Sequence, residues 1–367
     1  MSLELRDRVV NSIQTKEPVY YSRPPRQGDS LINRWVYSYI LRKLSQETDL
    51  DYSSLNLRSY PYGNGLRKDY ADFGHYKYTD YNLLDITKKG IVAHQLQIVG
   101  SMVEVEVTEE DYGLVPQPDA ADFDPWFGFD KTEVINKGDI LRENIRLGVS
   151  RLVVIAQFGS QAEKRFSDKQ AQELAQFVKE NDPNSYVAVA TDKTVLRKSL
   201  PKPWHRITRP PSFYAFPYTT NEFKKQLQGE DYGKAVDQVI SDRDISTFCK
   251  WFYNADLLIA TDSFGSWLGC GAKSLRRDRN GRLEPTDAVI LYTIANPDIW
   301  KIPGVTRVVS HGLEYQRIFS SPNFDFLSYK QYYFVKPWAD SILSNDPRRA
   351  ITHEDIELVK DKIKCVL

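Results

Sequence analysis

An apolar run at residues 255–260 is followed by three oxygen-bearing side chains that could cap a helix or help to bind a phosphate. The run has the length and composition of a buried strand, and Thr261, Asp262 and Ser263 can each cap a helix that begins directly after it. A helix N-terminus presents unpaired N–H groups and the positive end of the helix dipole, which suit a phosphate. The stretch therefore predicts either a phosphate-binding turn or an ordinary capped helix packed on a sheet.

Three glycines follow in the first turns of the same helix, at positions 265, 269 and 271. Glycine lowers helix propensity by about 1 kcal/mol relative to alanine, so its repeated use indicates that the backbone there approaches something closely. That partner is either a neighbouring element of the fold or a ligand.

The elements that must position this turn fall into two halves of the chain. In the first half we expect an extended run at 17–25, a helix at 26–46, a strand at 81–87 and a segment at 90–102 whose pattern fits either a strand or a helix. Residues 115–130 are rich in proline and polar residues, as is typical of a loop. The first domain is therefore expected to end there.

The second half alternates strands with helices. The expected elements are a helix at 137–148, a strand beginning at 151 and stopping at Gly159, a helix at 167–181, a strand at 185–193, a helix at 244–254, the opening strand and a last strand at 288–294. Strand, helix and strand of these lengths imply a parallel sheet, and ligands bind beyond the carboxyl ends of such strands. The loops at 157–165, 261–266 and 26–30 are therefore expected to face a common cleft.

Length and charge exclude several classes of protein. A chain of 367 residues is long enough for two domains of ~150 residues each. Lysine plus arginine equals aspartate plus glutamate at 49 each, so the chain lacks the basic character of a nucleic-acid binder. Three cysteines and five histidines show no zinc-type spacing, which favours a reducing compartment, a cytoplasmic location and no dedicated metal site.

The N-terminal residues and the hydropathy pattern bear on membrane association. Residues 1–14 carry charges throughout and lack the apolar core of a signal peptide, and no window approaches the ~18 apolar residues of a membrane span. We therefore expect a protein that is soluble or peripheral at a membrane. The aromatic stretch at 59–81 fits either sugar or single-stranded nucleic-acid binding or a structured surface loop, and the neutral net charge favours the loop.

Together these segments resemble the heptosyltransferase-like glycosyltransferases of family nine, which have the GT-B fold. Gly28 and Asp29 in "RQGDSLINRW" match a GD pair that opens the first long helix of the family. The segments "VVIAQFGSQAEKRFSDKQ" and "LLIATDSFGSWLGCGA" are similar to the start of the family's second domain and to its strand followed by DSG or DTG. The resemblance runs from about residue 19 to 300 and rests on the order of these motifs.

The resemblance implies an α/β fold of two Rossmann-like domains whose parallel sheets face a central cleft. We expect an acceptor domain at 1–135, a nucleotide-sugar domain at 136–345 and a C-terminal helix at 346–367 that packs back on the N-terminal domain. Two positions depart from the family pattern. Phe264 stands where the family usually has glycine, and Trp267 where it often has histidine.

The resemblance also implies roles for particular residues. Asp29 would take the proton of the acceptor hydroxyl, although an aspartate at the start of a helix can equally be a cap. Asp262 would either hold the strand end or bind the donor sugar or ribose. The residues expected to hold the donor diphosphate are Lys164, Arg165, Asp262, Ser263, Phe264, Gly265 and Ser266, with Lys164 and Arg165 alternatively a solvated pair.

The implied activity is transfer of a sugar from a nucleotide-diphosphate donor to a hydroxyl of a glycan or another acceptor, with inversion and without a metal or separate cofactor. Three Asp-x-Asp pairs, at 49 and 51, 122 and 124, and 242 and 244, do not follow predicted strands and so lack the setting of a magnesium site. Two alternatives stay open. The chain could be a nucleotide-sugar epimerase or hydrolase, or a degenerate nucleotide-sugar-binding protein, for which Phe264 is the main argument.

Overall fold

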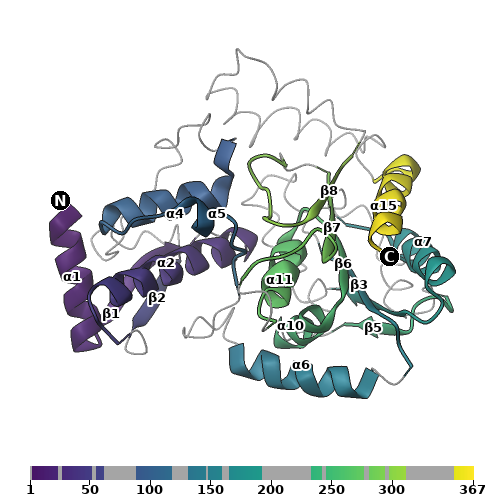
Figure 1. Ribbon diagram of the computed structural model, residues 1–367, viewed down its shortest axis with the longest axis horizontal. Helices are drawn as coiled ribbons and strands as arrows, with labels where there is room; N and C mark the ends of the chain where they lie inside the picture. Colours follow the sequence, from purple (N-terminus) through teal and green to yellow (C-terminus); the bar gives the residue numbers. More distant parts are fainter. Residues whose placement is uncertain are drawn as a thin grey trace, which may run out of the picture.

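Two groups of elements make up the computed structural model, one at each end of the molecule (Figure 1). We call the described residues up to 117 the N-terminal unit and those from 131 the C-terminal unit. The structure describes residues 2–23, 27–51, 55–61, 88–117, 131–145, 148–158, 165–191, 233–241, 245–276, 281–293, 297–310 and 351–367.

The N-terminal unit contains a small parallel sheet covered by helices. Its elements are α1 (Ser2–Thr15), β1 (Pro18–Arg23), α2 (Gln27–Glu47), β2 (Asn56–Pro61), α4 (Ile91–Met102) and α5 (Glu109–Tyr112). Strands β1 and β2 pair in parallel, with Pro18 beside Asn56 and Arg23 beside Pro61. Because parallel neighbours need a crossover, α2 connects them as a βαβ unit.

The C-terminal unit is built on a six-stranded parallel sheet in the order β5-β4-β3-β6-β7-β8. Its strands are β3 (Leu152–Gln157), β4 (Tyr186–Thr191), β5 (Gln238–Ile240), β6 (Leu257–Thr261), β7 (Ala288–Tyr292) and β8 (Thr306–Val309). Its helices are α6 (Lys131–Ile145), α7 (Asp168–Asn181), α10 (Ile245–Asn254), α11 (Phe264–Lys273) and α15 (His353–Val366). The expected α/β class with parallel sheets is confirmed.

Helices cover both faces of this sheet, as side-chain alternation along its strands requires. On β3, Val153 and Ile155 belong to the buried cluster that includes α7 and α15, whereas Val154 and Ala156 belong to the cluster that includes α10 and α11. Both faces are therefore apolar, and the strands have the near-continuous hydrophobic composition of a parallel sheet buried on two sides.

The strand order reverses between β3 and β6. From β3 the chain builds outward through β4 to β5, then returns to the other side of β3 with β6 and continues to β7 and β8. In open parallel sheets a ligand binds outside the carboxyl ends of the strands at this point of reversal. The loops after β3 and β6 are therefore the first place to look for a site.

The glycines of α11 allow the helix to approach neighbouring side chains. A Cβ on Gly269 would lie 2.6 Å from Leu258 Cδ2 on β6, and one on Gly265 would lie 2.7 Å from Phe158 Cβ, beyond β3. Both contacts are shorter than real Cβ atoms tolerate. At these two positions the close partner is a neighbouring element.

Three expectations about the first half can be compared with the structure. The extended run at 17–25 contains β1, and the helix expected at 26–46 is α2. The ambiguous segment at 90–102 is a helix, α4. The strand expected at 81–87 lies outside the described residues.

The C-terminal helix does not pack on the N-terminal unit as we expected. It lies at the opposite end of the molecule, beside α7 and the strands β7 and β8 (Figure 1). The apolar stripe of α15, at Ile356, Val359 and Ile363, is buried in the same cluster as Leu174 and Val178 of α7. The expectation was wrong because this face of the sheet offers an apolar surface that α15 completes.

Helix α6 belongs to the C-terminal unit, because it packs on α10. Asn254 Nδ2 at the end of α10 donates to the Gly138 carbonyl oxygen at 2.7 Å, and a Cβ on Gly138 would lie 2.5 Å from the ring of Tyr253. The second unit therefore includes α6 from its first residue, Lys131, so the expected boundary between 135 and 136 falls inside this helix.

A partly buried ion pair holds α5 against α2 in the N-terminal unit. Asp111 accepts hydrogen bonds from Lys43 Nζ at 2.8 Å, from Thr108 N at 2.7 Å and from the Tyr39 hydroxyl. Burial opposes the charged form of Asp111, but these donors outweigh it and hold the pKa of the carboxyl below its usual range. The contribution of Asp111 to stability is thus complete above its unfolded pKa of ~3.9 and is lost as pH falls through the lower folded pKa.

We expect Asp111→Asn to lower the free energy of unfolding by about 1.5–3 kcal/mol at pH 7, because the hydrogen bonds to the buried carboxylate lose their charge. The difference from the parent should shrink below about pH 4, where the carboxyl is protonated in the unfolded chain. Urea unfolding at pH 7 and pH 3 measures both values. The control is Glu110→Gln, an exposed position of the same helix, and an Asp111→Asn effect no larger than this control would contradict the assignment.

No helix among the described residues combines the length and the apolar composition needed to cross a bilayer.

Candidate functional site

The loop after β6 and the start of α11 lie beside the end of β3, at the point where the strand order reverses. Phe158 follows β3 directly, and its side chain packs against the backbone of Gly265 in the first turn of α11. Phe158 of the loop predicted at 157–165 and Gly265 of the loop predicted at 261–266 are therefore neighbours.

Asp262 joins the ends of two strands. Its side chain is buried, and Oδ1 accepts hydrogen bonds from the backbone N of Thr293 at 3.0 Å and from Thr293 Oγ1 at 2.9 Å, just beyond β7. Of the two roles that the sequence left open for Asp262, the structure shows the one that fixes the strand-end geometry. Thr293 was not predicted, because nothing in its local sequence marks it as the partner of a residue on another strand.

Ser263 and Ser266 differ in how their hydroxyl groups are used. Ser266 Oγ accepts from the Ser263 backbone N at 3.2 Å and donates to the Ser263 carbonyl oxygen at 2.7 Å, which fixes the first turn of α11. Ser263 Oγ is buried and faces the Ser266 N–H as the N-cap of α11, but it makes no hydrogen bond within the described part of the chain. A buried hydroxyl without a partner is costly, so it marks a place where a ligand oxygen would be stabilising.

The start of α2 lies against the start of α11. A Cβ on Gly28 would lie 3.8 Å from Phe264 Cα and 4.0 Å from Phe264 N, so the two backbones approach closely. Gly28 is the second residue of α2 and Phe264 the first of α11. The positive ends of two helix dipoles therefore converge, and an anion bound there would relieve their mutual repulsion.

Asp29 lies in the first turn of α2. The helix begins at Gln27, so Asp29 is its third residue. A carboxylate in the first turn still interacts favourably with the helix dipole. The structure describes the backbone of Asp29 and not the position of its carboxylate.

Of the two basic residues expected near the site, the structure describes Arg165. Its Nη2 donates to Thr191 Oγ1 at 3.2 Å, which places Arg165 at the carboxyl end of β4, the neighbour of β3. Lys164 lies outside the described residues. Gln157, which is fully buried, donates to the Phe166 carbonyl oxygen at 3.1 Å and so anchors the far end of the same loop.

The thiol of Cys270 is in α11 but is unsuited to chemistry. Burial raises the pKa of Cys270 to about 12, although Lys273 on the next turn acts to lower it. A thiol with this pKa is protonated near neutral pH, and the thiolate is the reactive form.

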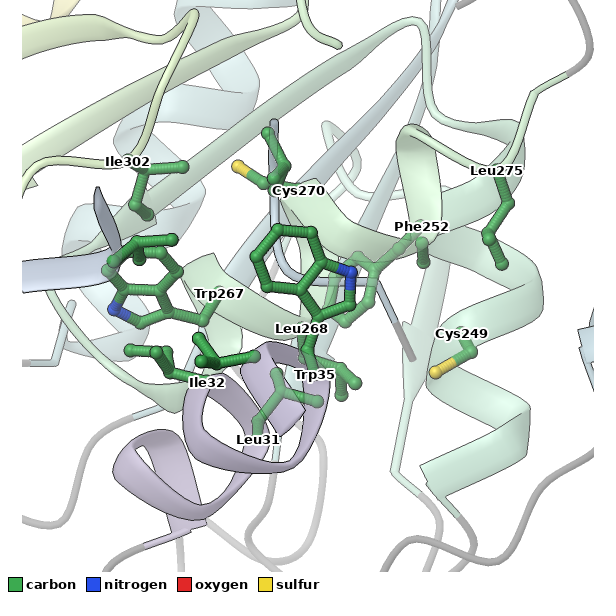
Figure 2. Packing of buried hydrophobic residues seen from close by; sticks show 14 of the residues in the cluster. Leu31, Ile32, Trp35, Cys249, Phe252, Trp267, Leu268, Cys270, Leu275 and Ile302 are labelled. Carbon is green, nitrogen blue, oxygen red and sulfur yellow. The ribbon is translucent and has the colours of Figure 1, made fainter. Parts of the chain in front are cut away.

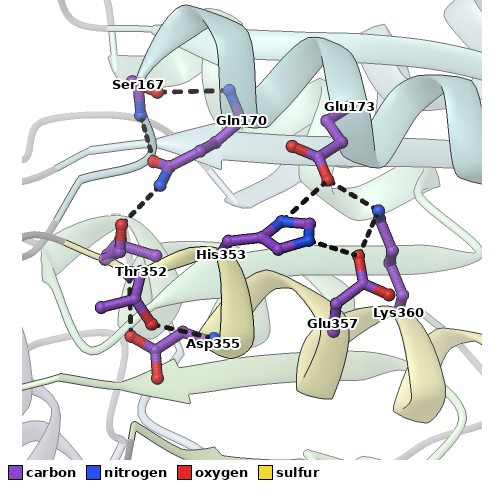
Figure 3. A network of polar contacts seen from close by, with 9 residues as sticks. Ser167, Gln170, Glu173, Thr352, His353, Asp355, Glu357 and Lys360 are labelled. Carbon is purple, nitrogen blue, oxygen red and sulfur yellow. Dashed lines mark hydrogen bonds and ion pairs between the residues drawn. The ribbon is translucent and has the colours of Figure 1, made fainter. Parts of the chain in front are cut away.

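One group of metal-ligand side chains occurs among the described residues, on the opposite side of the sheet from α11 (Figure 3). Glu173 on α7 and His353 and Glu357 on α15 bring one ligand atom each within 4.8 Å of one another. Lys360 Nζ already lies 2.7 Å from Glu173 Oε1 and 2.6 Å from Glu357 Oε1. The lysine ammonium thus occupies the position a cation would take, and the group is an ion-pair network between α7 and α15.

Comparisons with known proteins return distant structural similarities. No protein-family model and no curated protein sequence matches the chain. Among solved structures, the chain is similar to a family 9 glycosyl transferase from Veillonella parvula, with 11% identity and a TM-score of 0.46 over 90% of this chain and 97% of that one.

It is also similar to the E. coli heptosyltransferase WaaC in two structures, one with ADP and one with ADP-2-deoxy-2-fluoro heptose. The identity is 9% in both, with TM-scores of 0.36 and 0.32 over 75% and 73% of this chain. The matches span 64% and 62% of the WaaC chains, less than two thirds of their length. At this distance the chemistry of the site has to be argued from its own residues.

Proposed function

We propose that the chain is a glycosyltransferase that moves a sugar from a nucleotide-diphosphate donor to an acceptor hydroxyl. The observation that carries the proposal is the convergence of the first turns of α2 and α11 where the strand order of the parallel sheet reverses. Two helix N-termini and the unpartnered hydroxyl of Ser263 suit a group with several anionic oxygens, and a diphosphate supplies them.

The proposed mechanism assigns the two units different roles. Asp29 takes the proton of the acceptor hydroxyl as it attacks the anomeric carbon from the side opposite the diphosphate, which inverts the configuration. The leaving diphosphate gains negative charge, and the N–H groups at the start of α11 stabilise it without a metal ion. Arg165 and Lys164 add positive charge at the neighbouring loop.

The wider setting follows from composition. We propose that the acceptor is a glycan or another hydroxyl-bearing molecule. We also propose that the reaction occurs in the cytoplasm, because the spacing of the three cysteines shows no disulfide framework and thiols stay reduced there. Association with a membrane surface would then be peripheral.

A thermal-shift panel of nucleoside diphosphates and nucleotide sugars tests the donor site. We expect at least one member at ~100 times its dissociation constant to stabilise the folded chain by about 2.7 kcal/mol, which raises the melting temperature by several degrees. Free nucleosides without phosphate are the matched control and should shift it far less. If no phosphorylated member exceeds its nucleoside, the proposed donor site is wrong.

Product analysis with the best donor then separates the alternatives. Transfer to an acceptor supports the proposal, and release or isomerisation of the sugar without an acceptor supports a hydrolase or epimerase. Binding without any turnover supports a degenerate nucleotide-sugar-binding protein. Phe264 would then mark the lost activity, because it replaces the glycine usual in the family that the chain resembles.

A further inference from the structure

We infer that the N-terminal and C-terminal units form one rigid body, so that a ligand enters a site that is already assembled instead of closing a hinge between two domains. The rigidity is independent of the proposed function, and only its consequence for donor binding rests on that function. Domains within a chain are expected to move relative to each other unless their interface is large and hydrophobic. Among the described residues, the contact between these two units is formed by buried apolar side chains.

The apolar part of the interface is formed by α2 and α11, which contact each other directly (Figure 2). Trp35 on α2 is 6% exposed and Trp267 on α11 is 5% exposed, although indole rings are seldom buried so fully. Leu31 and Ile32 of α2 and Ile302 of the C-terminal unit belong to the same buried cluster. This one cluster continues from α1 in the N-terminal unit to the strands of the large sheet.

Backbone hydrogen bonds join the units at two further places. Ile91 N at the start of α4 donates to the Ile299 carbonyl oxygen at 2.7 Å. Val115 N donates to the Gly281 carbonyl oxygen at 2.9 Å, beside a bond of 3.3 Å from Gln117 Nε2 to the Ser274 carbonyl oxygen. With the α2–α11 contact, these bonds connect the units through several segments that are far apart in sequence. A hinge motion would have to break them together.

Calorimetry of the whole chain tests whether the units unfold together. Ile40→Val changes a fully buried residue in the N-terminal unit, and Ile363→Val changes a fully buried residue on the far face of the large sheet. If the units form one body, the chain unfolds in one transition and each variant lowers the same melting temperature. Two transitions, each shifted by only one variant, would overturn the inference.

A disulfide across the interface tests rigidity in the folded state. A Cβ on Gly90 would lie 3.1 Å from Lys301 Cγ, close to the roughly 3 Å between a Cβ and the partner sulfur in a disulfide. The engineered disulfide therefore joins Gly90→Cys to Lys301→Cys. The variant also carries Cys365→Ser, which removes the exposed native thiol. Gly90 has a φ of 85°, so the reduced double variant, with the same backbone strain, is the reference.

We expect the oxidised and reduced forms of this disulfide variant to give superimposable small-angle scattering profiles. Their affinities for the best nucleotide of the thermal-shift panel should agree within about twofold. A larger radius of gyration in the reduced form, or loss of binding only on oxidation, would overturn the inference. If no nucleotide binds either form, the proposed function fails, while the scattering and the calorimetry still decide whether the units are rigid.

Discussion

Asp29→Asn is expected to reduce the rate of sugar transfer by about 10²- to 10⁴-fold while the protein stays folded and binds its donor. Asparagine keeps the shape of the side chain and much of its hydrogen bonding, but it cannot take up the proton of an acceptor hydroxyl. Because Asp29 is in the first turn of α2, loss of its charge should also lower stability by about 0.3–1 kcal/mol through the helix dipole. The catalytic effect is much larger than the structural one.

The matched control is Glu4→Gln, which also removes a carboxylate from the first turn of a helix, α1, at the other end of the N-terminal unit. We expect a similarly small change in melting temperature and no change in turnover. The paired measurements are melting temperature, donor affinity and initial rate for both variants. If Asp29→Asn folds, binds donor and transfers sugar near the parent rate, Asp29 is not the base.

The large sheet could be predicted because its strands carry their own signal. Strands buried on both faces of a parallel sheet are apolar runs, and Leu152–Gln157, Tyr186–Thr191, Leu257–Thr261 and Ala288–Tyr292 all have this composition. The intervening helices show amphipathic spacing and caps, as at Ser167, where the side chain accepts from Gln170 N. These are local properties, so one sequence is enough to identify them.

Other features depend on partners that are distant in sequence. The amphipathic pattern of α15 predicts that one face is buried but does not say that α7 covers it. Residues 91–96 of α4 are buried all round, so their hydrophobic pattern has no period that separates a helix from a strand. The glycines at 265 and 269 indicated a close approach, and only the fold shows that the partners are Phe158 and Leu258.

For the candidate site, the sequence predicted which segments take part but not what each side chain does there. The turn at 262–266 was identified from residue types, and the Gly28–Asp29 pair from its resemblance to a family motif. The structure brings Gly28 and Phe264 together. The roles within the turn were not predictable, because they depend on which hydroxyl finds a partner. Asp262 uses its carboxylate on Thr293, and Ser266 uses its hydroxyl on the Ser263 backbone.

This difference between the two serines leads to different expectations for their alanine variants. Ser266→Ala removes a hydroxyl that makes two bonds within the first turn of α11 and leaves the Ser263 N–H without its acceptor, so it should lower stability by about 1–3 kcal/mol. Ser263→Ala removes a buried hydroxyl that makes no hydrogen bond among the described residues but faces the Ser266 N–H as the N-cap of α11, so it should lower the stability of the ligand-free protein less than Ser266→Ala does.

Ligand binding should reverse the order of the two variants. If Ser263 Oγ donates to a diphosphate oxygen, its loss removes a hydrogen bond to a charged group worth about 1.5–3 kcal/mol, which corresponds to a loss of affinity of about 10- to 150-fold. Ser266 donates to the Ser263 carbonyl oxygen instead, so Ser266→Ala should weaken binding far less. Melting temperatures without ligand and calorimetric titration of both variants with the same nucleotide measure the two effects. If Ser263→Ala lowers stability as much as Ser266→Ala and leaves affinity unchanged, its hydroxyl is structural and the anion site lies elsewhere.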